Sequence, residues 1–316
     1  MAQVAVLGAG TMGHALALVF ALGGHSVQLT DNNRETLERA PALMTAALAT
    51  LVQAGEAGAD WSAERLGRAV RCLPELEDTV REAELVIEAI IEQPEAKRTL
   101  FGQIDGMMRE DAIVASNTSY LDVFPLIPKR RQRRALIAHW YTPPYLVDLV
   151  DLCPGPETDP AVLESVRGIV AAMGKVPVVF RKLVPGYVAN RLQAAMALEV
   201  YRLLDEGAAT PRDIDASVIH GLALRMPILG VLAKADFTGL ALHQDALANG
   251  TYAPPEPRGR SEALDRLLAE GRTGVMAGKG FFDWSGESAE DLFRERDSRL
   301  LALKRAFREI GPLQGK

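Results

Sequence analysis

The chain has 316 residues, of which 48% are hydrophobic, and it carries a formal net charge of −6. This length suits two domains with sizeable cores, and the acidic balance argues against a general nucleic-acid or membrane-surface binder. No stretch of about 18 apolar residues and no charged leader is present, so we expect a cytoplasmic protein without a membrane span. Cys72 and Cys153 each end an apolar run, so we expect reduced residues in or near the core rather than a disulfide or metal framework.

The first half of the chain alternates short apolar strands with helical stretches. The run VAVLG (Val4–Gly8) predicts a buried strand, and the following TMGHALALVFALGG predicts a helix that ends at two glycines. Strands are predicted at residues 4–8, 26–31, 69–73, 85–89, 112–116, 135–139, 148–153 and 176–181. Apolar strands separated by helices are typical of a mainly parallel sheet that is covered on both faces.

Two segments of this half have open interpretations. Ala40–Glu64 is alanine-rich, helical in pattern and longer than an ordinary crossover, so it either projects as a helical arm or packs flat. Lys129–Arg134 (KRRQRR) is the one basic cluster of the chain. Because it lies between a helix signal and an apolar strand signal, we interpret it as a solvated loop rather than a binding patch.

The second half has a helical pattern throughout. Residues 185–207 predict a long helix that ends at a glycine, and Thr210 with Pro211 predicts the capped start of another helix. Further helical patterns continue without a convincing strand. We therefore predict an α/β Rossmann-type dinucleotide-binding domain at residues 1–183, followed by an all-α C-terminal domain at residues 184–316.

A glycine-rich turn follows the first strand and opens the first helix. It has the G-x-G-x-x-G spacing, and its place at the start of a βαβ unit is the context that a dinucleotide-binding fingerprint requires. Gly8 allows the tight turn, Gly10 lets the backbone approach a pyrophosphate, and Gly13 lets the helix pack against the sheet. The helix N-terminus offers free N–H groups to the anion. The predicted cofactor contacts of this turn are Gly8, Gly10, Thr11, Met12 and Gly13.

Asp31 ends the second strand, 23 residues after Gly8. A carboxylate at this point accepts hydrogen bonds from the ribose hydroxyls and repels a 2′-phosphate, which selects NAD over NADP. The next cation is Arg34, whereas an NADP site more often has an arginine beside or in place of the acid. The alternative is that the glycines form only a tight turn and that Asp31 is a strand-end cap.

The stretch AHWYTPPYLVDLVDL (138–152) places a histidine directly after an apolar strand. In an open α/β sheet, ligands bind at the carboxyl ends of the strands, where His139 is expected. A histidine can accept the proton of an alcohol while a hydride leaves, because the ordinary pKa of an imidazole lies near working pH. The other ring nitrogen needs an orienting carboxylate, and either Asp148 or Asp151 can serve. The alternative is a packed or surface histidine.

Several segments, in matching order and spacing, resemble the 3-hydroxyacyl-CoA dehydrogenase family over nearly the full length. They are the Gly8–Gly13 turn, VIEAIIE (86–92), SNTS (116–119), HWYTPP (139–144) and PGYVANRL (185–192), and GKGFFDW (278–284) is similar to the family's C-terminal signature. The resemblance implies an NAD-dependent oxidoreductase that reversibly oxidises a secondary 3-hydroxyl to a ketone. It also implies a homodimer formed through the helical domain.

The same resemblance implies roles for individual residues. His139 is the general base, Asp151 orients it, and Ser119 and Asn190 hydrogen-bond the reacting oxygen. The structural alternatives are a helix N-cap for Ser119 and a mid-helix surface position for Asn190. The family's usual orienting acid is Glu, and Asp151 is shorter by about 1.5 Å. Misplacement on this scale can cost on the order of 100-fold in rate, unless the backbone or a bridging water compensates.

Three more positions are implied to lie near the cofactor. Glu92 and Lys97 correspond to family residues near the nicotinamide and its ribose, and their structural alternative is an exposed helix start. The family's asparagine after the histidine, which approaches the nicotinamide, is Thr142 here. The hydroxyl of Thr142 keeps a polar group at this point, but the amide is lost.

Two features bear on the substrate. Family members that act on CoA thioesters carry lysines for the CoA phosphates on a helical arm after the second strand, whereas Ala40–Glu64 has no lysine or arginine. The segments PPY after the histidine and GLALRMPILG (221–230) are similar to the branch that contains L-gulonate 3-dehydrogenase, lambda-crystallin and carnitine dehydrogenase, which act on small free hydroxy acids. Arg225 lies where that branch has an arginine, and a guanidinium matches a carboxylate bidentately. The alternative for Arg225 is a structural ion pair with a helix acid.

Three functions therefore compete. We favour an NAD-dependent dehydrogenase for a small free hydroxy acid. The alternatives are a genuine L-3-hydroxyacyl-CoA dehydrogenase of the β-oxidation type and a weakly active NAD(H)-binding protein with a structural or sensing role. The expected partners are a small-molecule hydroxy-acid or acyl-CoA substrate and a second copy of the chain, with no nucleic acid, membrane or metal.

Overall fold

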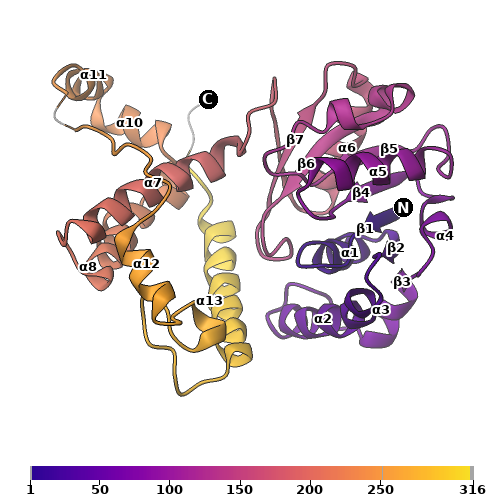
Figure 1. Ribbon diagram of the computed structural model, residues 1–316, viewed down its shortest axis with the longest axis horizontal. Helices are drawn as coiled ribbons and strands as arrows, with labels where there is room; N and C mark the ends of the chain where they lie inside the picture. The colour runs from indigo at the N-terminus through magenta and orange to yellow at the C-terminus, as the bar shows by residue number, and fades with distance from the viewer. Residues whose placement is uncertain (1, 251, 314–316) are drawn as a thin grey trace. The chain divides into compact units, whose positions relative to one another are not determined.

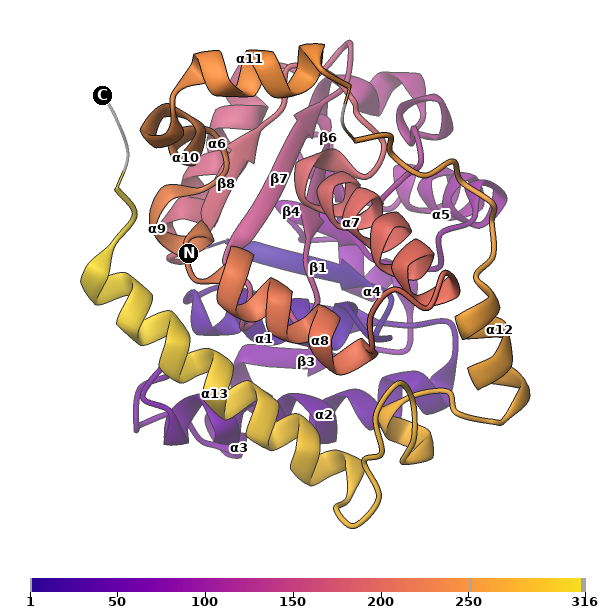
Figure 2. The ribbon, with the colours of Figure 1, turned by 90° about the vertical axis from the view of Figure 1, so that its left-hand side faces the viewer.

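The computed structural model describes residues 2–250 and 252–313 (Figure 1). The chain forms two compact units, and the division falls between Tyr187 and Val188. The first unit contains a sheet with helices around it, and the second unit is helical (Figures 1 and 2).

Eight strands form one sheet in the first unit, in the order β3-β2-β1-β4-β5-β6-β7-β8. They are β1 (Gln3–Leu7), β2 (Ser26–Thr30), β3 (Val70–Cys72), β4 (Leu85–Glu88), β5 (Ile113–Ser116), β6 (Ala135–Trp140), β7 (Leu149–Pro154) and β8 (Val176–Val179). Neighbouring strands are parallel except for the antiparallel pair β6 and β7. Every residue of β4, β5 and β6 is buried, which explains their continuous apolar runs. The predicted Rossmann-type fold with a mainly parallel sheet is confirmed.

Helices connect the strands, and polar side chains cap the N-termini of several of these helices. The helices of this unit are α1 (Gly13–Leu22), α2 (Arg34–Gln53), α3 (Ala63–Ala69), α4 (Leu76–Val80), α5 (Pro94–Asp105), η1 (Phe124–Leu126), η2 (Lys129–Arg134) and α6 (Pro160–Ala172). The side chains of Asn33, Ser62 and Asp159 accept backbone N–H groups at the starts of α2, α3 and α6. Both cysteines are free, with Cys72 half-buried and Cys153 buried.

The alanine-rich crossover packs flat, so the projecting-arm alternative is wrong. The apolar side chains that α2 buries recur every three or four residues, which places them on one face; they are Leu37, Ala40, Met44, Leu48 and Leu51. α2 contacts α1 and α3, and Figure 1 shows it beside both. The crossover therefore completes the core of the first unit.

The solvated-loop prediction for the basic cluster is wrong, because residues 129–134 form the 3-10 helix η2 and Arg131 is only 4% exposed. The Arg131 guanidinium donates to the Asp105 carboxylate at 2.8 Å and to the carbonyl oxygens of Asp105 and Met108. Carbonyl groups at a helix C-terminus have no partner within the helix, so Arg131 caps the end of α5. The pattern of charges alone does not reveal which arginine of a basic run finds such a partner.

The second unit consists of helices joined by loops (Figure 2). The helices are α7 (Tyr187–Asp205), which begins at the division, α8 (Pro211–Ala216), the π-helix η3 (Ser217–Ala223), α9 (Met226–Leu229), α10 (Leu232–Thr238), α11 (Leu240–Ala248), α12 (Glu262–Ala269), η4 (Val275–Ala277) and α13 (Ala289–Ile310). The predicted cap at Thr210 is confirmed, since its side chain accepts the Asp213 N–H at the start of α8.

This helical unit buries few apolar side chains. Within residues 188–250 and 252–313, only Ile214, Ala263 and Leu301 are buried hydrophobic residues. Over the described chain, no single helix combines the length and apolarity needed to cross a bilayer. The bent pair Pro211–Leu229 and Leu232–Thr238 meets those criteria only when its two parts are taken together.

Candidate active site

The glycine turn lies at the carboxyl end of β1, beside β4, where the order of strands along the sheet reverses. Gly8 has a φ of +97°, and a Cβ there would lie 2.6 Å from the Ala89 carbonyl oxygen. A Cβ at Gly13 would lie 1.6 Å from the Gly8 carbonyl oxygen. The turn therefore requires glycine at both positions: Gly8 because of its left-handed φ and its contact with Ala89 after β4, and Gly13 because α1 begins in direct contact with the Gly8 carbonyl group.

The same turn fits the pyrophosphate of a dinucleotide. A Cβ at Gly10 would meet nothing within 4 Å, so space beside the backbone is open. The α1 N-terminus at Met12 has no side-chain cap, which leaves its N–H groups available to an anion. Of the other two predicted contacts, Thr11 is exposed and Met12 is half-buried.

Asp31 lies just after β2 and accepts a hydrogen bond from the glycine turn. Its Oδ2 accepts the Ala9 N–H at 2.7 Å, and its Oδ1 accepts the Asn33 N–H at 2.8 Å. Each carboxylate oxygen has further acceptor capacity, and the side chain is half-buried. Asp31 can therefore hold the turn and still accept hydrogen bonds from ribose hydroxyls.

His139 lies near the carboxyl end of β6 and is only 3% exposed. Ser119 follows the neighbouring parallel strand β5, and its Oγ lies 3.1 Å from His139 Nε2, within hydrogen-bonding distance. Ser119 is in a loop, so the helix N-cap alternative is wrong. The two side chains form a polar pair at the edge of the sheet where ligands bind in this fold.

The opposite ring nitrogen of His139 faces Asp151. These residues are direct cross-strand partners in the antiparallel pair of β6 and β7, and His139 Nδ1 lies 3.5 Å from Asp151 Oδ2. That separation is too long for an ordinary hydrogen bond, and Nδ1 has no hydrogen-bond partner in the described chain. Asp148 does not face the histidine but forms an ion pair with Lys175 at 3.0 Å. Register therefore selects Asp151 over Asp148.

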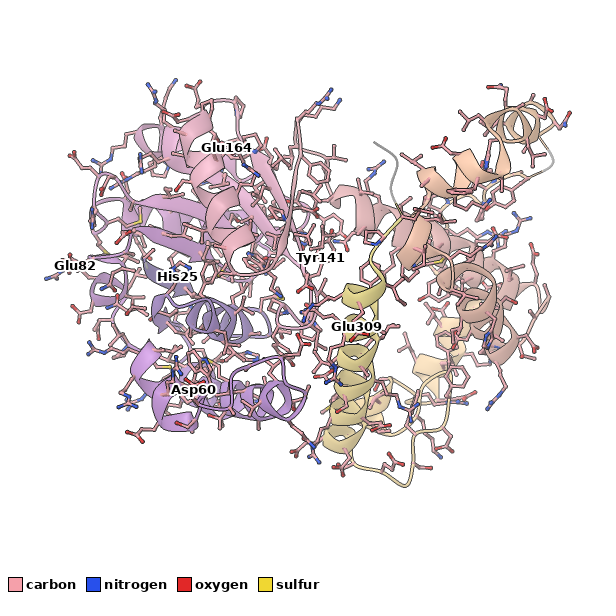
Figure 3. All side chains as sticks on the ribbon, turned by 180° about the vertical axis from the view of Figure 1, so that it is seen from behind. His25, Asp60, Glu82, Tyr141, Glu164 and Glu309 are labelled. Carbon is pink, nitrogen blue, oxygen red and sulfur yellow. The ribbon has the colours of Figure 1, made fainter. Side chains whose placement is uncertain are left out.

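Two tyrosines that the sequence analysis did not single out contact the His139 ring. Tyr141, labelled in Figure 3, meets it edge-on, with ring centroids 4.6 Å apart and an interplanar angle of 78°. Tyr187 stacks on it at 4.6 Å and 26°. The Tyr141 hydroxyl donates to Asp151 Oδ2 at 2.6 Å, and the Tyr187 hydroxyl donates to the Thr118 carbonyl oxygen at 2.9 Å.

Both tyrosines remain protonated donors at neutral pH. Burial, followed by the hydrogen bond to Asp151, raises the pKa of Tyr141 above its usual range. Burial is also the main reason that the pKa of Tyr187 is raised. Tyr187 has a φ of 49°, a left-handed conformation that is rare for an aromatic residue. A helix signal that begins at Pro185-Gly186 gives no indication of this conformation.

A buried ion pair lies beneath the loop that carries Ser119. Glu88 at the end of β4 is 0% exposed and Lys97 on α5 is 1% exposed, and Lys97 Nζ lies 2.5 Å from Glu88 Oε1. Ser116 Oγ donates to the second Glu88 oxygen at 2.5 Å. The exposed-helix alternative is therefore wrong for Lys97. Glu88 was missed, although an acid at the end of the apolar run LVIE was a visible signal.

Glu92 connects this ion pair to the loop after β5. Lys97 Nζ lies 3.3 Å from Glu92 Oε2, while Glu92 Oε1 accepts Thr118 Oγ1–H at 2.6 Å and the N–H groups of Ser119 and Tyr120. Burial raises the pKa of Glu92, but these hydrogen bonds and the Lys97 charge outweigh it, so the pKa is lowered overall. Glu92 is half-exposed and ionised, and it sets the position of the Ser119 backbone.

The remaining predicted site residues lie in three places. Thr142 is in the nucleotide-binding unit, where its Oγ1 donates to Met12 Sδ at 3.0 Å and so joins the loop after β6 to the glycine turn. Asn190 is on α7 and Arg225 directly precedes α9, both in the helical unit. The Arg225 guanidinium donates to the Gly221 carbonyl oxygen and lies near no carboxylate of the described residues, which argues against the structural ion pair.

Comparison with known proteins agrees with this geometry. Residues 3–183 match the family model described as 3-hydroxyacyl-CoA dehydrogenase, NAD binding domain, and residues 186–284 match the model of its C-terminal domain. The chain is 29% identical to a 5-formyl-3-hydroxy-2-methylpyridine 4-carboxylate 5-dehydrogenase from Mesorhizobium japonicum, over 96% of this chain and 97% of that protein. It is 31% identical to L-carnitine dehydrogenase from Streptomyces griseus, over 96% and 89% of the two chains. A crystal structure of a 5-formyl-3-hydroxy-2-methylpyridine 4-carboxylic acid 5-dehydrogenase covers 98% of this chain and 99% of its own, with a TM-score of 0.85 and 28% identity.

Proposed function

The chain belongs to the 3-hydroxyacyl-CoA dehydrogenase family and is an NAD-dependent oxidoreductase that acts on CH–OH groups, and we propose that its substrate is a small free hydroxy acid. We also propose catalytic and binding roles for the site residues, and a homodimeric assembly.

The crossover after β2 carries the substrate part of the proposal. CoA phosphates require cations or free N–H groups, and residues 40–64 contain neither lysine nor arginine. Three of the arginines that flank this segment have acidic neighbours, since Arg34 pairs with Glu38, Arg65 with Asp60 and Arg68 with Glu64. Because α2 packs flat, it also lacks the reach of a projecting arm. These features favour a substrate without a CoA moiety.

Arg225 is the proposed anchor for the substrate carboxylate. Its side chain is exposed, and its guanidinium is tied to one backbone carbonyl rather than to an acid. A guanidinium in this state has donors free to bind a carboxylate in bidentate fashion. Two relatives have names that specify small acids, a pyridine carboxylate and carnitine, which supports the same substrate class.

The proposed mechanism uses the contacts of His139 with Ser119 and Asp151. NAD supplies the hydride acceptor when it is bound, with its pyrophosphate at the glycine turn and its ribose at Asp31. His139 Nε2 accepts the proton of the substrate hydroxyl, and Ser119 and Asn190 hydrogen-bond the reacting oxygen. Asp151 stabilises the imidazolium that forms. Glu92 and Thr142 line the nicotinamide side of the site, while Lys97 acts through Glu92, because its ammonium group is buried.

The substrate class is tested with NADH and a panel of free 3-oxo acids measured beside acetoacetyl-CoA. We expect kcat/KM for the best free acid to exceed that for the thioester at least about tenfold, equivalent to about 1.4 kcal/mol. A preference for acetoacetyl-CoA would make the protein a genuine L-3-hydroxyacyl-CoA dehydrogenase. Tight NADH binding without turnover of any panel member would favour the weakly active alternative.

The anchor is tested with Arg225→Met. Loss of charge-assisted hydrogen bonds worth about 1.5–3 kcal/mol is expected to raise KM for the free acid on the order of 10- to 100-fold. The matched control is Arg294→Met, which removes an exposed arginine that pairs with Glu290 on α13. An unchanged KM in Arg225→Met would refute the anchor without affecting the other parts of the proposal.

The homodimer is supported by the thin core of the helical unit. Large apolar side chains on its surface include Leu224, Leu232, Phe237 and Leu247, which are between 69% and 82% exposed. Exposed apolar surface on this scale marks an interaction site, and a second copy is its proposed occupant. Light scattering after gel filtration is expected to give twice the 34.2 kDa of one chain. A monomer at all micromolar concentrations would refute this part.

A further inference from the structure

We propose that Tyr141 is a positioning residue that sets the basicity of His139 by sharing Asp151 Oδ2 with it. The inference rests on the proposed function only in so far as His139 is the catalytic base. The contact among the three side chains lies wholly within the nucleotide-binding unit.

The Tyr141 hydroxyl and the His139 imidazole both approach one oxygen atom of Asp151. Tyr141 Oη lies 2.6 Å from Asp151 Oδ2, and His139 Nδ1 lies 3.5 Å from the same atom. A short bond from a hydroxyl to a carboxylate is among the stronger hydrogen bonds in proteins, whereas 3.5 Å is beyond the ordinary range. The phenol, rather than the imidazole, is therefore the main donor to Asp151.

The backbone explains why these three groups meet. Tyr141 directly follows β6, two residues after His139, and its ring meets the His139 ring edge-on while its hydroxyl reaches Asp151. Asp151 is the residue opposite His139 on β7. Asp151 and His139 are 2% and 3% exposed, so little water reaches the contact. The aspartate is too short to bond the histidine, and the tyrosine hydroxyl takes the oxygen that faces it.

The other titratable groups near the His139 ring are neutral or bound elsewhere. Tyr187, stacked from the start of α7, donates to a backbone carbonyl and stays protonated because burial raises its pKa. Cys153, two residues beyond Asp151 on β7, is neutral because burial raises its pKa to about 11. Glu92, beyond the Ser119 loop, is held by Lys97 and Thr118. Within the described nucleotide-binding unit, Asp151 is thus the anion that contacts the imidazole.

The direction of the effect follows from electrostatics. A carboxylate favours the protonated form of a neighbouring imidazole. The hydrogen bond from Tyr141 stabilises the negative charge on Oδ2 and weakens that influence, so His139 holds its proton less tightly. The hydroxyl of Tyr141 thereby keeps the base unprotonated, and able to accept the substrate proton, to lower pH than an unshared Asp151 would allow.

The test compares the full-length chain with Tyr141→Phe by NMR titration of the histidine Cε1–H signals. The chain has five histidines, and the signal that disappears in His139→Gln identifies the one of interest. The titration midpoint of His139 is expected to rise by about half to one pH unit in Tyr141→Phe, a roughly three- to tenfold gain in proton affinity. An unchanged or lower midpoint would overturn the proposal.

Two further variants make the result specific. Tyr187 also contacts the His139 ring, but its hydroxyl is not bonded to Asp151. If Tyr187→Phe raises the titration midpoint of His139 as much as Tyr141→Phe does, the proposal is overturned. In an Asp151→Asn background, Tyr141→Phe is expected to leave the His139 midpoint unmoved; a full-sized rise there would likewise overturn it.

The pH profile of kcat/KM separates this inference from the proposed function. In the oxidation direction with NAD, His139 must start unprotonated, so its protonation gives the acidic limb of the profile. If Tyr141→Phe moves both the NMR midpoint and this acidic limb upward, both proposals stand. A shift in the NMR midpoint without any shift in the kinetic profile would support the coupling of Tyr141 to His139. That same result would refute the role of His139 as the catalytic base.

Discussion

Replacing Lys97 with Met tests whether the buried ion pair supports the active-site loop. Lys97 Nζ lies 2.5 Å from Glu88 Oε1, and the two side chains are 1% and 0% exposed. Met keeps most of the apolar volume but removes the cation, so Glu88 is left buried without a counter-charge. Breaking one side of a buried pair costs about 3–5 kcal/mol. At roughly 2–4 °C per kcal/mol for a unit of this size, Tm is expected to fall by about 6–20 °C.

The measurement is thermal unfolding followed by circular dichroism near pH 7, with two control variants. Arg34→Met breaks the exposed pair with Glu38, whose atoms lie 2.8 Å apart but whose side chains are 89% and 64% exposed, so a cost of at most about 1 kcal/mol is expected. The double variant Glu88→Gln, Lys97→Met removes both charges and is expected to regain a large part of the lost Tm.

The reasoning is refuted if Lys97→Met lowers Tm no more than Arg34→Met does. In that case, Glu88 would not depend on Lys97, and the loop after β5 would have to be held by other contacts. If the double variant is less stable than Lys97→Met alone, the hydrogen bonds that Glu88 accepts from Ser116 and Ile90 outweigh its ionic interaction with Lys97.

Two further predictions concern the turn and the loop. Gly13→Ala places a Cβ 1.6 Å from the Gly8 carbonyl oxygen, so the turn must open; NADH affinity, measured by fluorescence titration, is expected to fall at least about tenfold, and an unchanged Kd would contradict the close packing. The pKa of Glu92 is lowered because hydrogen bonds, chiefly from Thr118, outweigh the effect of its burial. The ionised Glu92 therefore stabilises the fold at pH values above the usual glutamate pKa of 4.5, and this contribution is lost as the pH falls through the lowered pKa. The Tm of Glu92→Gln is therefore expected to fall less than that of the native chain between about pH 6 and about pH 3; equal losses would show that other carboxylates dominate.

The sequence determined the fold class because its signals are local. Each strand of the sheet is a short, mainly apolar run, and Gly13 is required by its contact with the carbonyl oxygen of Gly8, five residues earlier. The close approach at Gly8 itself is to Ala89 after β4, so it depends on the sheet. Asp31 could be placed for a similar reason, since the end of β2 must lie beside the turn in any βαβ unit. The identity of His139 as a site residue depended on a resemblance, because a strand-end histidine has no local pattern of its own.

Several features were decided only by tertiary structure. The choice between Asp148 and Asp151 depended on the register of β6 against β7, where a shift of one residue would turn the other face of the strand toward the histidine. The pairing of Lys97 with Glu88 joins a helix to a strand nine residues earlier, and only their shared burial shows that the two charges must meet.

The aromatic groups around the histidine depend on tertiary structure most strongly. Tyr187 reaches His139 through a left-handed backbone conformation that no propensity favours. Tyr141 became part of the site because its hydroxyl meets the aspartate that the sequence analysis judged too short. The sequence showed that His139 and Asp151 were the candidate base and acid, and that the side chain of Asp151 is one carbon shorter than the family's usual Glu. Only the packing of β6 against β7 decided which donor binds the carboxylate, because hydrogen bonds depend on tenths of an ångström that no sequence pattern specifies.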